Sequence, residues 1–104
     1  MKIKQGVRLD GVHWKMFAAA IKIEAVLEKY GQECVITAGV DGKHMAKSRH
    51  YVGCALDFRN RDLQKADHNS VILDINAVLG YEYFTQMESN HIHCQWNGTV
   101  IDMI

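Results

Sequence analysis

The spacing of apolar residues along the chain predicts two amphipathic helices. In the first third of the chain, apolar residues recur at steps of three and four from Trp14, with Asp10 available as an N-cap and Gly31 as a stop. We therefore expect a helix over residues 11–30. A second helical pattern ends at Gly80. The apolar positions are Trp14, Phe17, Ala18, Ile21 and Ala25 in the first helix, and Val71, Ile72, Ile75, Val78 and Leu79 in the second.

Short runs rich in β-branched and aromatic residues predict strands between and after these helices. The segment 40–51 contains Asp41-Gly42 and few apolar residues, so we expect a loop there. Asn97-Gly98 is a strong signal for a two-residue hairpin leading into a short last strand. The predicted strands cover residues 33–38, 54–58, 81–87, 91–96 and 99–103. The expected fold class is α+β, with a small, mostly antiparallel sheet packed against two helices.

Length and charge exclude several classes of protein. The chain has 104 residues, 48% of them hydrophobic, which suits a single domain over residues 1–104. Twelve basic and twelve acidic residues give zero net charge, so we expect no non-specific binding to nucleic acid. No apolar run is long enough for a membrane-spanning helix, and the start lacks the apolar stretch of a secretory signal. We therefore expect synthesis in the cytoplasm and no membrane insertion.

Cysteine and histidine usage directs attention to the histidines. Cys34, Cys54 and Cys94 are odd in number and widely spaced, which does not indicate a disulfide framework. We interpret them as small buried residues in a reducing compartment. The chain also has six histidines, and imidazole is the commonest metal ligand and proton carrier near neutral pH.

Asp57 is the first candidate for chemistry, because it lies inside an otherwise apolar strand. Burying an unpaired carboxylate costs several kcal/mol (about 2 or more), so Asp57 needs a cation, a helix terminus or a metal beside it. An ion pair with Arg59, Arg61 or a lysine is the simpler interpretation. His50, which leaves the preceding loop, is another possible partner.

His91 and His93 form the second candidate group. In an extended strand their side chains lie on one face, while Ile92 and Cys94 point the other way. Taken alone, they are most simply two surface histidines. Together with His50 and Asp57 they suggest two histidines and one aspartate holding one catalytic Zn²⁺, with room for water as the fourth ligand. A nearby glutamate, Glu88, would supply a base for that water.

These motifs resemble a known family of zinc peptidases. Ser48-x-His50-x-x-Gly53-x-Ala55-x-Asp57, followed by Glu88 and His91-x-His93, is similar to the D-alanyl-D-alanine carboxypeptidases and L-alanyl-D-glutamate endopeptidases. That family shares its fold and metal site with the hedgehog signalling domain. Asp41-Gly42-Lys43-His44 and His91-Ile92-His93-Cys94 are especially similar to the hedgehog version. The resemblance covers about residues 33–96 and implies a hedgehog/DD-peptidase-like fold.

The resemblance implies a role for each residue. His50, Asp57 and His93 match the zinc ligands, and Glu88 matches the general base. His91 and His44 match histidines beside the metal that steady the water, the substrate or the oxyanion.

The spacing of Glu88 leaves two alternatives. Many members place the acid three residues before the ligand histidine, and that position relative to His93 is Asn90. Either the chain between Glu88 and His93 bulges to bring the carboxylate to the water, or His91 is the ligand and His93 the accessory residue. We expect His93 to be the ligand.

The resemblance implies hydrolysis of peptidoglycan stem or cross-bridge peptides. Carboxypeptidases of the family hold the substrate carboxylate with an arginine after the first strand, and this chain has Ala38-Gly39-Val40-Asp41 there. Lys43 or Arg49 would act only as a point charge, so endopeptidase cleavage is favoured over D,D-carboxypeptidase action. Short proteins of this type resemble those of bacteriophages and prophages, which implies a lysis enzyme that reaches the wall through a holin or in the virion. The alternatives are a catalytically inactive zinc-binding interaction module of the hedgehog type and an enzyme acting on dipeptides from outside the wall.

Overall fold

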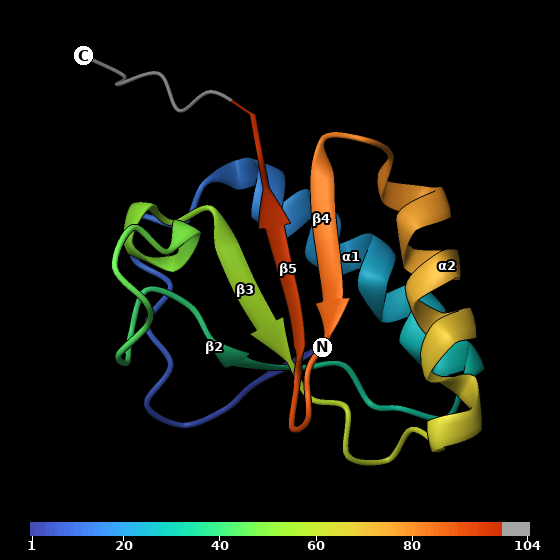
Figure 1. Cartoon of the computed structure of the whole chain (residues 1–104). Helices are drawn as coiled ribbons and strands as arrows, with labels where there is room; N and C mark the ends of the chain where they lie inside the picture. The colour runs from blue at the N-terminus through green and yellow to red at the C-terminus, as the bar shows by residue number, and fades with distance from the viewer. Residues whose placement is uncertain (99–104) are drawn as a thin grey trace.

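The chain folds as an α+β structure with one five-stranded mixed sheet and two helices, seen in a computed structural model that describes residues 1–98 (Figure 1). The strand order is β1-β2-β3-β5-β4, with β1 parallel to β2 and every other neighbouring pair antiparallel. In chain order the elements are β1 (Lys2–Ile3), α1 (Trp14–Lys29), β2 (Val35–Ala38), the 3-10 helix η1 (Arg49–Val52), β3 (Ala55–Phe58), the 3-10 helix η2 (Lys65–Asp67), α2 (His68–Leu79), β4 (Tyr83–Met87) and β5 (Ile92–Trp96).

The predicted fold class is confirmed, and the predicted strands up to residue 96 all form within the expected ranges. The short parallel strand β1 was not predicted, because two exposed residues carry no periodic signal. The segment expected to be a loop contains η1, which the short range of a 3-10 turn hides from pattern analysis. The predicted strand at 99–103 lies outside the described residues.

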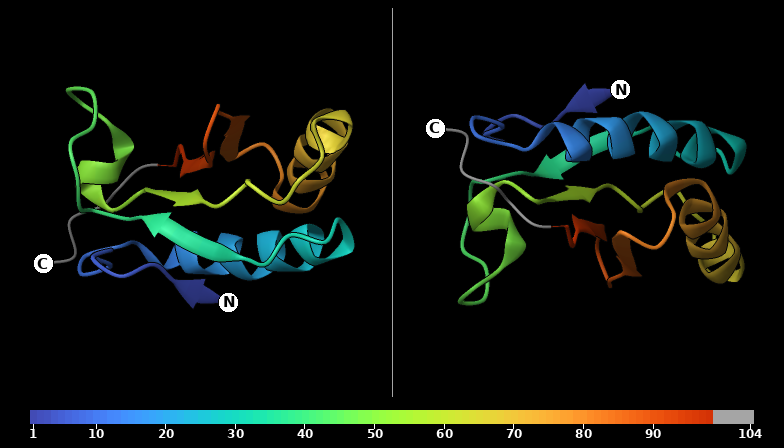
Figure 2. Two further views of the ribbon diagram at one scale, coloured as in Figure 1. Left: turned by 90° about the horizontal axis from the view of Figure 1, so that it is seen from below. Right: turned by 90° about the horizontal axis from the view of Figure 1, so that it is seen from above.

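Alternating burial gives the sheet two different faces. In β5 the side chains of Ile92, Cys94 and Trp96 are buried, while those of His93 and Gln95 are only partly buried. Leu56 and Phe58 of β3 join the buried side, and α1 runs behind β3, β5 and β4 in Figure 1. The outward residues of β3 and β5 therefore face away from the main hydrophobic core, and two further views show the layers edge-on (Figure 2).

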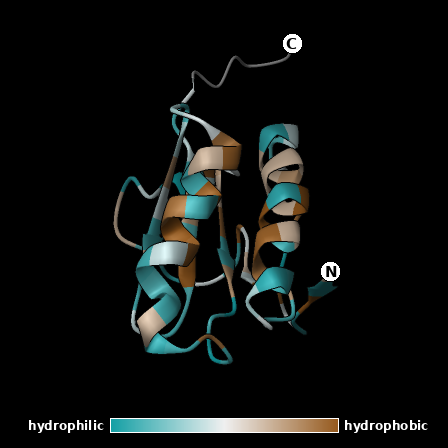
Figure 3. Ribbon diagram, turned by 90° about the vertical axis from the view of Figure 1, so that its right-hand side faces the viewer, coloured by the Kyte–Doolittle hydropathy of each residue, from teal (hydrophilic) through white to brown (hydrophobic). Residues whose placement is uncertain are grey.

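The prediction of α1 was right about the helix and wrong about its buried face. The residues that α1 buries belong to a neighbouring stripe, whereas Trp14 is 64%, Phe17 39% and Ile21 66% exposed. Apolar residues occur on several sides of this helix, so spacing alone does not select one stripe; packing against α2 and the sheet does. Figure 3 shows the two helices side by side with hydrophobic residues along both. The buried residues of α1 are Met16, Ala19, Ala20, Ile23, Val26 and Leu27.

The N-cap prediction was also wrong. The cap is His13, whose Nδ1 accepts a hydrogen bond from the backbone N–H of Lys15 at 3.1 Å. Asp10 instead pairs with the Arg8 guanidinium at 2.8 Å, so the helix begins at Trp14 rather than at residue 11. The predicted stop is confirmed, because Gly31 adopts a φ of +77°, a left-handed conformation that favours glycine.

The three cysteines are buried and free, as predicted. Burial raises the pKa of the Cys34 thiol to about 12 and that of Cys94 to about 11, so both are poor nucleophiles. Within residues 1–98, no helix is both long and apolar enough to cross a lipid bilayer.

The observed face of α1 gives a matched prediction from two isoleucines. Ile23→Ala should lower the free energy of unfolding by about 2–5 kcal/mol, because Ile23 is fully buried in the core. Ile21→Ala should change it by less than about 0.5 kcal/mol, because that side chain is 66% exposed. Urea unfolding of both variants measures the difference, and equal losses would contradict the assigned face.

Candidate metal centre

Strand pairing places Asp57 and His93 next to each other on the outer face of the sheet. β3 and β5 are antiparallel neighbours, and Asp57 is the direct cross-strand partner of His93. Directly opposed side chains on one face have Cβ atoms about 4.5–5.5 Å apart, so the pairing itself brings carboxylate and imidazole into contact. His93 Nδ1 lies 3.2 Å from Asp57 Oδ1.

His50 reaches the same carboxylate from η1. The Ser48 hydroxyl accepts a hydrogen bond from the backbone N–H of His50 at 3.2 Å, which confirms the predicted capping role of Ser48. Gly53 ends η1 at a φ of +75°, and its position against the backbone of Gly11 leaves no space for a Cβ. The chain thus enters β3 with His50 only 2% exposed and its Nε2 atom 3.0 Å from Asp57 Oδ1.

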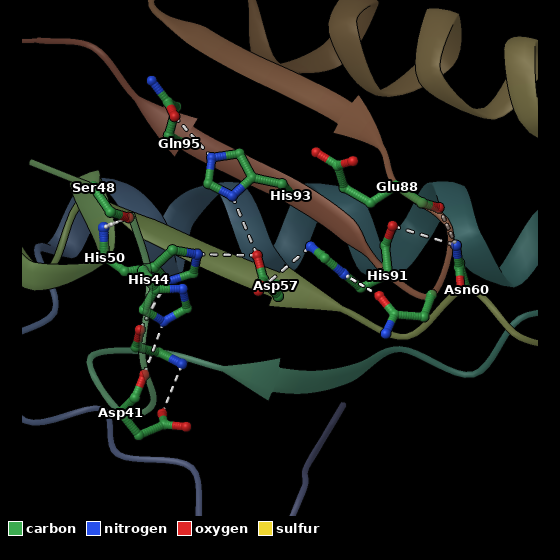
Figure 4. A network of polar contacts seen from close by, with 12 residues as sticks. Asp41, His44, Ser48, His50, Asp57, Asn60, Glu88, His91, His93 and Gln95 are labelled. Carbon is green, nitrogen blue, oxygen red and sulfur yellow. Dashed lines mark hydrogen bonds and ion pairs between the residues drawn. The ribbon is translucent and has the colours of Figure 1, made fainter. Parts of the chain in front are cut away.

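Three imidazoles therefore surround one carboxylate (Figure 4). His91, in the turn between β4 and β5, places its Nε2 atom 3.6 Å from Asp57 Oδ2. The Asp57 side chain is only 10% exposed. The predicted group of His50, Asp57, His91 and His93 is brought together around this carboxylate.

Each of these imidazoles also has an acceptor on its other ring nitrogen. Gly39 O lies 2.8 Å from His50 Nδ1, Gln95 Oε1 lies 2.7 Å from His93 Nε2, and Asn90 Oδ1 lies 2.6 Å from His91 Nδ1. A neutral imidazole carries one N–H and cannot donate to two acceptors. A ring held between two acceptors therefore requires a second proton or a metal ion on the Asp57 side.

Charge at the site follows from these contacts. Burial opposes ionisation of Asp57, but hydrogen bonds from His50 and His93 outweigh it and hold the pKa of the carboxyl well below its usual range. The hydrogen bond to Asp57 raises the pKa of His93, although burial acts in the opposite direction. The centre therefore contains a carboxylate that is ionised at neutral pH and an imidazole that binds a cation, here a proton, more firmly than usual.

His44 joins the cluster by stacking on His50. Their ring centroids are 3.9 Å apart with an angle of 6° between the planes, and His44 Nε2 lies 2.8 Å from Asp41 O. One donor atom each from His44, His50 and Asp57 lies within 4.8 Å of the others, so these three residues could hold a metal ion. His44 was predicted as a helper beside the metal rather than as a ligand.

The donor set suits a small divalent cation. Nitrogen and carboxylate oxygen are typical zinc ligands, and tetrahedral bonds of about 2.0–2.1 Å put ligand atoms roughly 3.4 Å apart. The distances of 3.0 Å from His50 Nε2 and 3.2 Å from His93 Nδ1 to Asp57 Oδ1 are close to that separation. The hydrogen bond from His50 Nδ1 to Gly39 O also directs Nε2 toward the centre, as the outer partners of metal-binding histidines commonly do.

Glu88 lies at the edge of the same cavity, which has a volume of about 800 Å³ and is also lined by His44, His50, Asp57 and His93. Its backbone N–H donates to His91 O at 2.8 Å, which closes the turn after β4. Within residues 1–98 the Glu88 carboxylate has no hydrogen bond or ion pair, and Figure 4 shows it beside His91. Its role as a base stays a prediction, as does the choice between His91 and His93 as the third ligand.

Sequence analysis missed the residues that hold the histidines in place. Asn60 is 5% exposed, and its side-chain amide donates to Glu88 O at 3.1 Å and to His91 O at 3.3 Å. No local pattern marks Asn60, because its partners are far away in sequence. Gln95 was detectable, since it is the next outward position of β5 after His93.

Comparisons with known proteins add no relative: no family model matches the chain, and neither a curated protein nor a solved structure matches it.

The raised pKa of His93 predicts how the metal-free protein responds to pH. A folded-state pKa above the unfolded value gives stability that is complete below about pH 6.5 and is lost as the pH rises through the folded pKa. In the presence of a chelator, the free energy of unfolding should therefore fall between pH 6.5 and 8.5. The lowered pKa of Asp57 gives stability at neutral pH that is lost in acid, below about pH 4.

Urea unfolding at several pH values measures both trends. His93→Gln should abolish much of the loss above pH 6.5, and His68→Gln, which changes a histidine of α2 outside the cluster, should not. Added zinc should reverse the slope, because metal ligands must be deprotonated. A metal-free parent whose stability increases from pH 6.5 to 8.5 would contradict the assigned His93–Asp57 interaction.

Proposed function

We propose that this chain is a zinc-dependent peptidase that hydrolyses peptidoglycan stem or cross-bridge peptides, with endopeptidase cleavage favoured. The observation that carries the proposal is the set of three imidazoles, each held between the Asp57 carboxylate and a second acceptor, in a cavity that also contains Glu88. Such a set binds a cation and leaves an acid free beside it. The sequence motifs that resemble the D-alanyl-D-alanine carboxypeptidase and L-alanyl-D-glutamate endopeptidase family supply the substrate class.

In this proposal His50 and Asp57 hold the metal with His93, and His44 is close enough to replace or supplement a ligand. Zinc, when bound, supplies a Lewis acid that polarises the scissile carbonyl and makes water a better nucleophile near neutral pH. Asp57 carries negative charge at neutral pH, so the protein offers the cation an anionic ligand without first losing a proton.

The remaining residues handle the proton and the developing charge. The Glu88 carboxylate takes a proton from the attacking water and delivers it to the leaving amine, which is the usual division of a general base and acid. His91 is 30% exposed and faces the cavity, so its N–H can donate to the oxyanion that forms as water attacks. Asn90 and Asn60 position the turn that carries His91.

We also carry forward the fold assignment and the biological setting as parts of the proposal. A mixed sheet with helices behind it and a histidine-rich outer face is compatible with the hedgehog/DD-peptidase fold. A phage or prophage lysis enzyme would meet peptidoglycan after passage through a holin or delivery in the virion.

One observation favours the second candidate, a zinc-binding interaction module without catalysis. At the position three residues before His93, where many enzymes of the family have an acid, Asn90 binds the His91 ring at 2.6 Å. A module of this kind would keep the metal for structure or partner binding and would cleave no peptide.

Glu88→Gln separates the two functions. For a peptidase, this variant should keep its zinc and lose activity by about 10²–10⁴-fold, because the amide cannot accept the proton. Glu28→Gln, at an exposed position of α1, should leave activity unchanged. The measurement is mass spectrometry of new peptide termini after incubation with purified peptidoglycan, beside zinc content of each variant.

The outcomes are distinct. A zinc-loaded parent that releases no new termini would overturn the peptidase and favour the interaction module. Full activity in Glu88→Gln would remove Glu88 from the mechanism. Cleavage of free dipeptides without cleavage of peptidoglycan would move the substrate class away from the cell wall.

A further inference from the structure

A second cavity adjoins the histidine cluster on the side away from His44 and His50. It has a volume of about 530 Å³, which lies in the range of small-molecule sites, about 300–1,000 Å³. Asp57, Asn90 and His91 line both this cavity and the larger one that holds Glu88. In Figure 4, His91 lies on the opposite side of Asp57 from His44 and His50. A ligand at Asp57 can therefore extend past His91 into the second cavity.

The second cavity is strongly basic. Lys4 follows β1, and Arg59 and Arg61 follow β3, so the fold brings three cations from two distant segments to one wall. The only acid in its lining is Asp57, which already contacts three imidazoles. Because the chain has no net charge, this excess of positive charge is local.

The three cations are free to meet a ligand. Among residues 1–98, Lys4, Arg59 and Arg61 take part in no ion pair. Glu33 lies close enough for Arg59 to help lower its pKa, but its carboxylate is bound to Lys2 at 3.0 Å. Half-buried Arg59 and exposed Arg61 thus retain their donors, and arginine binds carboxylates through two parallel hydrogen bonds.

Hydroxyl donors complete the chemistry of this wall. Thr37 at the end of β2 and Ser89 in the turn after β4 both line the cavity. Two guanidinium groups, an ammonium group and two hydroxyls form a donor-rich surface that matches a carboxylate and offers little apolar contact.

We propose that the cavity lined by Lys4, Arg59 and Arg61 binds a free carboxylate of the peptide whose scissile bond lies at Asp57. This inference rests on the proposed function and narrows its substrate class to peptides with a carboxylate near the cleaved bond. An extended residue spans about 3.3–3.6 Å, so the carboxylate belongs to one of the first residues beyond that bond. The cations come from the segments after β1 and β3, not from the loop after β2.

Binding of a minimal carboxylate to the metal-free full chain tests the inference independently of hydrolysis. The probe is N-acetylglycine, and its matched control is N-acetylglycinamide, which lacks only the negative charge. Two-dimensional amide NMR should show saturable shifts at residues 37–38, 59–61 and 89–91 with the acid. The carboxamide should bind at least about tenfold more weakly, since charge-assisted hydrogen bonds contribute about 1.5–3 kcal/mol.

Substitutions locate the cations that bind the probe. Arg59→Gln and Arg61→Gln should each weaken N-acetylglycine binding by about tenfold. Lys22→Gln, an exposed position on α1 that removes the same charge, should leave it unchanged. Dispersed amide spectra of every variant establish that each one is folded.

The failure of this inference is distinguishable from failure of the proposed function. Equal binding of acid and carboxamide, shifts confined to other residues, or equal weakening by Lys22→Gln would overturn the carboxylate site. Selective binding of the acid by a protein that cleaves no peptide would uphold the site and overturn only the peptidase.

Discussion

The buried carboxylate of Asp57 is the constraint on which the rest of this structure depends. A carboxylate on a central strand is tolerated only where cations or donors replace the water it has lost. The fold supplies them from three directions: His93 by cross-strand pairing, His50 from a capped 3-10 turn, and His91 from the β4–β5 turn. The outer hydrogen bonds of these rings to Gly39, Gln95 and Asn90 fix which nitrogen faces the carboxylate. The result is a preorganised site for a cation on a rigid sheet.

The hydrophobic core and the polar site are two consequences of the same strand geometry. Because side chains alternate along β5, the residues that bury Ile92 and Cys94 against the helices necessarily direct His93 and Gln95 outward. A slip of one residue in the β3–β5 register would bury the histidines and expose the core residues, so packing of the core maintains the site. This coupling explains how a small domain can hold a charged cluster without a large supporting structure.

Much of this arrangement was predictable from sequence, for reasons that differ between residues. Asp57 and the His91-x-His93 pair were identifiable because a charged or polar residue in an apolar strand breaks the pattern. Local periodicity found both helices, but it chose the wrong stripe of α1, since Trp14 and Ile21 fit a helical repeat as well as Ile23 does. Contacts between distant segments, such as Asn60 with the β4–β5 turn, have no local signature. The basic cavity was missed for the same reason, because Lys4 and Arg59 are neighbours only in the folded chain.

Zinc content of the purified chain after dialysis against low-micromolar zinc tests the central claim, that this cluster is a metal centre, most directly. Elemental analysis should find one zinc per chain in the parent and in His68→Ala, whose histidine lies in α2 outside the cluster. His50→Ala should retain almost none, because it removes the ligand atom 3.0 Å from Asp57 while Gly53 and Ser48 still shape the turn. A folded parent without zinc, or a His50→Ala variant that retains it, would contradict the account.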